Sequence, residues 1–107
     1  MIKCIFCNLI KADDSNIIYQ NESLIVLPDI KPKSSIHLLI IPKMHILNLK
    51  NITSKNYKLL YNIFLTIKKI SKLNKINKDF KIIVNNGKYA GQEVFHLHFH
   101  FLGLGSK

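Results

Sequence analysis

The segment near the C-terminal end of the chain places a histidine at every second position, at His96, His98 and His100, with large apolar residues between them. Valine, leucine and phenylalanine favour extended backbone, and side chains alternate between the two faces of a strand. Residues 94–102 are therefore predicted to form a strand with three imidazoles on one face and apolar side chains on the other. Because histidine titrates near neutral pH and serves as nucleophile, proton donor or metal ligand, we expect the function to reside on this face.

Two other interpretations of the three histidines are open at this point. Histidines can be hydrogen-bonded residues of a core or its rim, without a chemical role. Alternatively, neighbouring residues on one face of a strand can reach a single ion, so three imidazoles can form a tri-histidine metal site. Other segments of the chain have to decide between these interpretations and a catalytic role.

The length and composition of the chain limit the kind of protein it can be. Its 107 residues, of which 48% are hydrophobic, suit a single domain over residues 1–107. No apolar run approaches the roughly 20 residues of a membrane span, and the first residues lack the pattern of a signal peptide. These features predict a soluble, cytoplasmic protein that does not act on a membrane.

The net charge of +10 raises the question of a nucleic-acid partner. All 16 basic residues are lysine, whereas arginine supplies most of the two-pronged contacts to phosphates and guanine bases. The lysines are also scattered, with no run longer than Lys68-Lys69. We therefore expect no nucleic-acid partner.

The remaining apolar patterns predict one long helix, one short helix and several strands. Residues 53–74 follow the 3.6-residue helical period, with Thr53 or Ser54 as the N-cap. The nearly all-apolar residues 37–41 are typical of a buried central strand that ends at Pro42. Because hairpin-compatible strands accompany a single long helix, the fold class is predicted as α+β with a mostly antiparallel sheet. The other expected elements are a short helix at residues 4–11 and strands at residues 17–20, 24–27 and 80–84.

The long helix carries more apolar residues than one sheet face can cover. Tyr57, Tyr61 and Leu65 widen its apolar arc beyond half of the circumference. The surplus predicts a second contact, most simply with another copy of the chain. The alternative is that the tyrosines lie at the edge of the core. The residues expected to face the sheet are Leu59, Leu60, Ile63, Phe64, Ile67 and Ile70.

The two cysteines of the chain, Cys4 and Cys7, have the spacing C-x-x-C. In an intracellular protein this spacing is more typical of a metal site or a redox pair than of a structural disulfide. The sequence contains no second C-x-x-C, which excludes a zinc site made of four cysteines. A redox pair usually opens a helix after a strand of a βαβ unit, a pattern that is not predicted here. A site with two cysteines and two histidines would need histidines from elsewhere in the chain.

The segment from Gly91 to His100 resembles the signature of the histidine triad (HIT) family, in which three histidines alternate with hydrophobic residues. Four further segments resemble family blocks in the order and spacing of the family, so the resemblance covers nearly the whole chain. It is closest to the Hint branch of purine nucleoside phosphoramidases, particularly its bacterial-type members. The resemblance implies a HIT-like fold, with a five-stranded antiparallel sheet, one long helix and a short N-terminal helix, which forms homodimers with a continuous ten-stranded sheet. The four further segments are Cys4–Cys7, Asp29–Pro32, His37–His45 and Val84–Gly87.

The resemblance assigns catalytic roles to four histidines. His98 is similar to the family nucleophile, which attacks the α-phosphorus and forms a nucleotidyl-histidine intermediate. His96 and His100 resemble its partners, which orient the ring and hold phosphate oxygens, and His37 resembles a fourth histidine on the neighbouring strand. Among the residues implied to bind the nucleotide, Asp29 would accept hydrogen bonds from the ribose hydroxyls. The others are Leu27 and Ile30 for the base, and Asn85, Gln92, Glu93 and Val94 near the phosphate and ribose.

The resemblance implies a hydrolase or transferase that cleaves purine nucleoside phosphoramidates, conjugates of AMP or GMP with an amine, at the α-phosphate. The residue types suit this chemistry, because a neutral imidazole with a fixed tautomer is a nucleophile near neutral pH and neighbouring N–H groups stabilise charge on the phosphate oxygens. No cofactor is expected to be required for catalysis. Three alternatives are a dinucleoside polyphosphate hydrolase, a nucleotide-binding adaptor with weak catalysis, and a zinc protein whose triad is a ligand set.

The resemblance also suggests a structural zinc site at Cys4, Cys7, His45 and His96. Some bacterial HIT proteins with a C-x-x-C pair and a histidine after the Ile-Pro block bind zinc. Two thiolates and two imidazoles form a closed tetrahedral set, which suits a structural role and would leave the middle histidine free as the nucleophile. The alternative is that two reduced cysteines pack beside Phe6.

Overall fold

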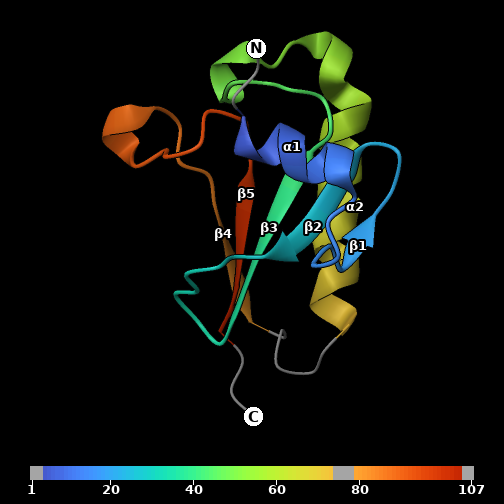
Figure 1. Cartoon of the computed structure of the whole chain (residues 1–107), viewed down its shortest axis with the longest axis vertical. Coiled ribbons are helices and arrows are strands. Elements are labelled where there is room, and N and C mark those ends of the chain that lie inside the picture. Colours follow the sequence, from blue (N-terminus) through green and yellow to red (C-terminus); the bar gives the residue numbers. More distant parts are fainter. Residues whose placement is uncertain (1–3, 74–78, 105–107) are drawn as a thin grey trace.

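The computed structural model describes residues 4–73 and 79–104 of the chain. A five-stranded sheet in the order β1-β2-β3-β5-β4 forms the middle layer, and each neighbouring pair of strands is antiparallel. The short helix α1 crosses one face of this sheet, and the long helix α2 lies behind the other face (Figure 1). The prediction of a five-stranded antiparallel sheet with one long helix and a short N-terminal helix is therefore confirmed. The elements are α1 (Ile5–Ala12), β1 (Tyr19–Gln20), β2 (Leu24–Pro28), β3 (Ile36–Pro42), α2 (Tyr57–Leu73), β4 (Phe80–Ile83) and β5 (Phe99–Gly103).

Two apolar clusters hold the helices against the sheet. The larger cluster, which we call the α2-side cluster, joins Ile63, Ile67 and Ile70 of α2 to one face of β2, β3 and β5. The smaller cluster, which we call the α1-side cluster, joins Phe6 of α1 to the other face of β2 and β3. Because both faces of β2 and β3 are covered, these strands are buried almost continuously and do not alternate between apolar and polar residues.

The long helix begins later than the sequence predicts. Thr53 caps a 3-10 turn by a capping box. The side chain of Thr53 accepts from a backbone N–H inside the turn, and the side chain of Asn56 accepts from the backbone N–H of Thr53. The α-helix begins only after this turn, at Tyr57, and its predicted end at Asn74 lies outside the described residues. No helix in the described part of the chain is long and apolar enough to cross a membrane.

One residue of α2 predicted to face the sheet, Phe64, instead lies on the outer side and is 62% exposed. It shares a helix face with Tyr57, Tyr61 and Leu65, because residues three, four, seven or eight positions apart lie on one side of a helix. These four residues form an exposed apolar row, which we call the outer stripe.

The histidine segment is only partly a strand, so the prediction of one continuous strand is wrong. β5 begins only at Phe99, and both His96 and His98 lie in the irregular segment that precedes it. The backbone of this segment bonds to a loop instead of a neighbouring strand, since the N–H of Leu97 donates to the carbonyl of Ile46 at 2.6 Å. Tertiary contacts therefore override the extended-chain propensity of these residues.

The predicted alternation of side chains persists through the irregular segment. Leu97 packs in the α2-side cluster together with Phe101 of β5. The rings of His96 and His98 meet the edge of Phe6 on the α1 side, at centroid distances of 5.8 and 5.0 Å. The histidine face is thus the face that α1 covers in part.

Phe101 in the middle of β5 is fully buried and stacks on Phe80 of β4, with ring centroids 4.7 Å apart. Phe101→Ala would remove these contacts and leave a cavity, so we expect the free energy of unfolding to fall by about 3–5 kcal/mol, measured by urea denaturation. Tyr89→Ala is the control, because Tyr89 is 99% exposed and its loss should change stability by less than about 0.5 kcal/mol. A loss below about 1 kcal/mol for Phe101→Ala would contradict this packing.

Candidate active site

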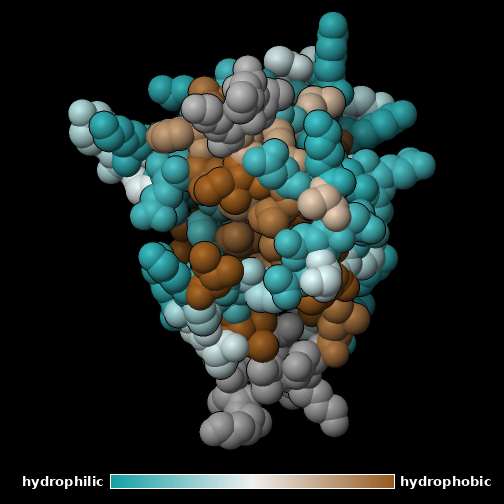
Figure 2. Space-filling view, viewed as in Figure 1, coloured by the Kyte–Doolittle hydropathy of each residue, from teal (hydrophilic) through white to brown (hydrophobic). Residues whose placement is uncertain are grey.

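The four histidines of the predicted catalytic set lie close together on the α1 side of the sheet. The register of β3 and β5 pairs Leu39 with His100, which makes His37 the diagonal neighbour of His100 on the same face. The ring of His100 lies 5.1 Å from that of His37 and 5.0 Å from that of His98, measured between centroids. Figure 2 shows that apolar side chains gather over the middle of this face and that hydrophilic residues surround them.

The tautomer of His98 follows from one backbone contact. Its Nδ1 lies 2.8 Å from the carbonyl oxygen of His96. A carbonyl oxygen can only accept, so Nδ1 carries the proton and donates. The neutral ring therefore has its lone pair on Nε2, and this nitrogen has no hydrogen-bond partner among residues 4–73 and 79–104. The lone pair on Nε2 of His98 is thus available for a bond to another atom.

A chain of hydrogen bonds fixes the tautomers of His37 and His100 in the same way. The backbone N–H of Lys33 donates to Nδ1 of His37 at 3.1 Å, so neutral His37 must carry its proton on Nε2. This Nε2 lies 2.9 Å from Nδ1 of His100, which must accept. Neutral His100 is therefore protonated on Nε2 and can donate to a phosphate oxygen.

Asp29 places a carboxylate beside this pair of histidines. Its Oδ2 lies 3.4 Å from Nε2 of His37 and 4.0 Å from Nδ1 of His100. Its Oδ1 accepts from the backbone N–H of Lys31 at 2.8 Å, which holds the side chain at the start of the loop between β2 and β3. The carboxylate is partly exposed and remains able to accept further hydrogen bonds.

Burial keeps the histidines of the site neutral. Desolvation is the largest cause that lowers the pKa of His37, His96 and His98, although backbone carbonyls and the Asp29 carboxylate oppose it at some of them. For His100, desolvation together with neighbouring histidines lowers the pKa to about 4. The rings are therefore uncharged near pH 7, which is the form that a histidine nucleophile requires.

The residues predicted to hold the nucleotide have different surroundings. Leu27 is buried in the α1-side cluster, and Val94 packs against it. Asn85 is partly buried and Glu93 is exposed, while Ile30 is 92% exposed. Of the two residues predicted to contact the base, Leu27 is therefore buried and Ile30 is accessible to solvent.

Gln92, another predicted nucleotide contact, is engaged within the protein. Its Oε1 accepts from the N–H of Gly87 at 2.8 Å, and its Nε2 donates to the carbonyls of Leu47 and Val94 at 2.8 and 3.1 Å. The side chain is 4% exposed. These contacts show Gln92 holding the loops on both sides of the histidine segment, and its contact with a nucleotide stays a prediction.

The four residues predicted to bind zinc come together from two distant segments and α1. Nδ1 of His96 lies 3.3 Å from Sγ of Cys4 and 3.6 Å from Sγ of Cys7. Nδ1 of His45 lies 3.1 Å from Nδ1 of His96 and 3.2 Å from Sγ of Cys7. All four ligand atoms lie within 4.8 Å of one another.

This cluster fits a tetrahedral zinc ion. Bond lengths of about 2.0–2.1 Å to nitrogen and about 2.3 Å to sulfur place tetrahedral ligand atoms roughly 3.3–3.8 Å apart, near the distances observed. The Nε2–H of His96 donates to the carbonyl of Pro42 at 2.7 Å, so the lone pair on Nδ1 faces the cluster. Burial, followed by the hydrogen bond with Cys4, raises the pKa of the Cys7 thiol, and a metal would have to displace its proton.

A second group of potential ligands, Asp29, His37 and His100, also lies within metal-binding distances. Its tautomers do not suit a metal. Because Nδ1 of His37 accepts from the Lys33 amide, Nε2 of the neutral ring bears a proton and has no lone pair to offer. This group is therefore a hydrogen-bonded set, and of the two groups found among the described residues only the cysteine–histidine cluster has lone pairs placed for a metal.

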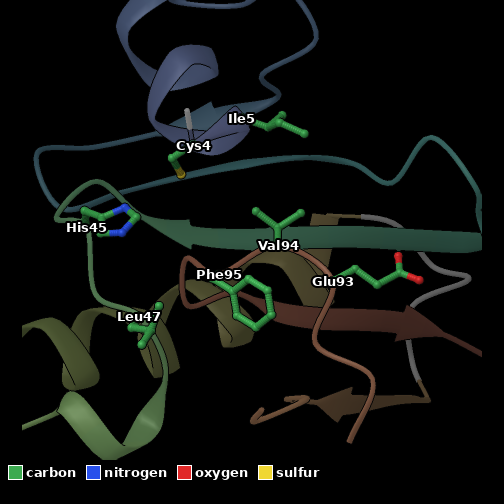
Figure 3. A pocket seen from close by; sticks show the side chains of 7 residues that line it. All are labelled: Cys4, Ile5, His45, Leu47, Glu93, Val94 and Phe95. Atoms are coloured by element: carbon green, nitrogen blue, oxygen red, sulfur yellow. The ribbon is translucent and has the colours of Figure 1, made fainter. Parts of the chain in front are cut away.

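A cavity of about 410 Å³ opens next to the cysteine–histidine cluster. Figure 3 shows side chains from the start of α1, from the loop after β3 and from the segment before His96 directed toward it. Two members of the cluster, Cys4 and His45, belong to its lining, together with Ile5, Leu47, Glu93, Val94 and Phe95. The cluster is therefore reachable from solvent.

Sequence reasoning missed the groups that fix the imidazoles. The carbonyls of Pro42 and His96 and the amide of Lys33 are backbone groups, which every residue type offers. Phe6, whose ring edge meets two histidines, was expected only beside the cysteines. No residue-specific signal in the sequence marks the backbone groups, whereas the apolar side of α1 indicates that Phe6 packs on the sheet.

Four histidines that burial keeps neutral thus lie beside an aspartate on the α1 side of an antiparallel sheet. Residues 3–107 match the family model described as "Scavenger mRNA decapping enzyme C-term binding". Protein HitA of Neisseria gonorrhoeae is 36% identical over 104 residues, which cover 96% of this chain and 97% of that protein. The chain belongs to the histidine triad family.

Solved structures of the family have the same fold. A HIT family hydrolase from Clostridium thermocellum is 41% identical, with a TM-score of 0.89 over 100% of this chain and 97% of that chain. A zinc-bound histidine triad family protein from Mycobacterium smegmatis is 28% identical, with a TM-score of 0.79 over 94% of this chain and 74% of that chain. The order of sheet and helices described above is therefore that of the family.

The lowered pKa of His100 makes stability depend on pH. In the unfolded chain His100 titrates near its ordinary value of 6.5, and in the folded protein at about 4. Between these values the unfolded chain binds more protons, so this group reduces the free energy of unfolding as the pH falls from about 6.5 to about 4. Urea denaturation across this range measures the effect.

His100→Gln is the matched variant for this experiment, because the Gln oxygen can still accept from His37 but does not titrate. We expect its stability to fall less steeply with acid than that of the wild type. The same pH dependence in both proteins would show that His100 is not the group responsible.

Proposed function

We propose that the chain is a nucleotide hydrolase or transferase that cleaves purine nucleoside phosphoramidates of the AMP-amine type at the α-phosphate. The observation that supports this most directly is the free Nε2 lone pair of His98, whose Nδ1–H is held by a backbone carbonyl. A neutral imidazole in this state needs no base to remove a proton before it attacks. His98 therefore serves as the nucleophile.

The reaction has two steps. Nε2 of His98 attacks the α-phosphorus, the P–N bond of the substrate breaks, and the amine leaves with the electron pair and takes up a proton from the solvent. Water then attacks the phosphorus of the nucleotidyl-histidine and loses a proton to the solvent, which releases the nucleotide and restores the lone pair on Nε2. The Nε2–H of His100 donates to the phosphate oxygens as charge builds up on them, and His37 holds His100 in the donating tautomer. These steps, as proposed, require no cofactor.

The nucleotide is proposed to bind beside the loop between β2 and β3. The carboxylate of Asp29 accepts hydrogen bonds from the ribose hydroxyls, and Leu27 and Ile30 contact the purine of AMP or GMP. On the other side of the histidines, Asn85 and the backbone around Val94 lie near the phosphate. Gln92 and Glu93 belong to the same segment.

The outer stripe on α2 supports the proposal of a homodimer. Its four members are 64%, 65%, 62% and 47% exposed in the single chain, and a second copy would remove them from water. β4 is an edge of the sheet, so a two-fold axis beside it could join two sheets into one of ten strands. The four members are Tyr57, Tyr61, Phe64 and Leu65.

We also propose that Cys4, Cys7, His45 and His96 hold a structural zinc ion. The distances in the cluster and the direction of the His96 lone pair support this. When bound, zinc supplies a fixed link between the start of α1, the end of β3 and the histidine segment. No step of the reaction is assigned to it.

His98→Ala and His98→Asn are expected to lower kcat for a fluorogenic AMP-amine substrate by about 1,000-fold or more, because the nucleophile is lost. Both variants should still bind AMP, which titration calorimetry measures. In the wild type, a rapid quench at alkaline pH, which preserves the P–N bond of the intermediate, followed by peptide mass spectrometry should find the nucleotide on His98. Turnover near that of the wild type in either variant would overturn the assignment, and a wild type that binds AMP without turnover would favour an adaptor.

Sedimentation velocity at micromolar concentration is expected to show twice the mass of the single chain. Phe64→Glu should shift the protein to the monomer, because it places a charge in the proposed interface. Tyr89→Glu is the control on another exposed aromatic residue and should leave the dimer unchanged. A wild type that sediments only as a monomer would contradict the proposal.

Elemental analysis of protein purified without added metal is expected to give about one zinc per chain, the capacity of one four-ligand site. Cys4→Ser should reduce this ratio strongly, because serine oxygen is a poor replacement for a thiolate. The absence of stoichiometric zinc from the wild type would end the zinc proposal.

A further inference from the structure

The segment that carries the nucleophile is held by few backbone contacts. It precedes β5 and is therefore outside the sheet ladder. Val94 and Leu97 pack into the two apolar clusters, but within residues 4–73 and 79–104 the hydrogen bonds that hold the segment to other elements are few. They are the N–H of Leu97 on the carbonyl of Ile46, the Gln92 amide on the carbonyl of Val94 and the ring of His96 on the carbonyl of Pro42. The carbonyl that fixes the tautomer of the nucleophile thus belongs to a residue whose backbone is outside any strand.

His96 makes three different contacts at once. Its Nε2–H donates to the carbonyl of Pro42 at the end of β3, and its Nδ1 faces the cysteine–histidine cluster. Its backbone carbonyl accepts from Nδ1 of His98. The ring is fully buried, so a displacement of the ring has to move the backbone to which it is attached. One residue therefore links the cluster to the nucleophile.

How firmly His96 is held depends on whether hydrogen bonds or metal–ligand bonds connect the four side chains of the cluster. Without a metal, the ring nitrogen of His96 meets two thiols at 3.3 and 3.6 Å, and S–H groups are weak donors. With zinc, the same atoms are joined by metal–ligand bonds, which anchor His96 to Cys4 and Cys7 of α1 and to His45. His45 lies after β3, so these anchors reach the histidine segment from two separate elements.

We infer that the cysteine–histidine cluster positions the nucleophile: zinc bound there holds His96, and through its carbonyl holds His98 in the reactive orientation. The ion does not touch the substrate in this arrangement, so its loss lowers kcat and leaves nucleotide binding nearly unchanged. Because Cys4 and His45 line a solvent-accessible cavity (Figure 3), zinc can be removed from and returned to the folded protein. This inference rests on the proposed function and on the proposed zinc site.

The test compares two substitutions at one ligand position. His45→Ala removes a ligand, whereas His45→Cys keeps a four-ligand set of three cysteines and one histidine, which also binds zinc. We expect His45→Ala to lose stoichiometric zinc and to lower kcat for an AMP-amine substrate by about 10–100-fold, with KM changed by less than about 3-fold. His45→Cys should keep the metal and most of kcat.

Hydrogen–deuterium exchange provides a readout that does not depend on turnover. In the wild type, dialysis against a chelator should speed exchange of the amide of Leu97, which donates to the carbonyl of Ile46, by about 10-fold or more, and added zinc should reverse this. His45→Ala should exchange fast with or without zinc. Ile10→Ala is the control for loosened packing of α1, since Ile10 packs against the α1-side cluster but is no ligand, and it should keep zinc, kcat and slow exchange.

The two kinds of failure are distinguishable. Zinc-free wild type or His45→Ala that retains wild-type kcat and slow exchange would overturn the inference, as would a wild type that binds no zinc. A wild type that shows zinc-dependent exchange but cleaves no AMP-amine substrate would overturn the proposed function and would support the link between the cluster and His98.

Discussion

A single backbone hydrogen bond, from Nδ1 of His98 to the carbonyl of His96, is the contact on which the chemistry of the site depends. It decides which nitrogen of the buried ring carries the lone pair. Burial then lowers the pKa of His98 and keeps the ring neutral. A fixed tautomer and a neutral ring are the two properties that a histidine nucleophile requires.

Hydrogen bonds to backbone groups also distinguish the two groups of potential metal ligands in the described part of the chain. The amide of Lys33 leaves His37 with a proton on the nitrogen that faces His100, so this pair forms a relay of hydrogen bonds. The carbonyl of Pro42 leaves His96 with a lone pair on the nitrogen that faces two thiols, so this ring suits a metal. The amide of Lys33 before β3 and the carbonyl of Pro42 at its end thus leave His37 and His96 with lone pairs that suit different roles.

The sequence predicts the chemistry-bearing residues better than it predicts their backbone. Alternation placed His96, His98 and His100 on one face, and they do lie on the α1 side, although β5 begins only at Phe99. The strand boundary was missed because the preceding residues bond to a loop, a long-range contact that local propensity does not contain. The helical period also places Phe64 in the core, although this residue is exposed. The period alone does not say which side of a wide apolar arc meets the sheet.

Backbone groups fix the tautomers of His37, His96 and His98, and His37 in turn fixes that of His100. Heteronuclear NMR of protein with nitrogen-labelled histidines, recorded near neutral pH, reports which nitrogen of each neutral imidazole is protonated. We expect a proton on Nδ1 of His98 and on Nε2 of His37, His96 and His100. A proton on Nε2 of His98, or a ring that exchanges freely between its two tautomers, would contradict this expectation.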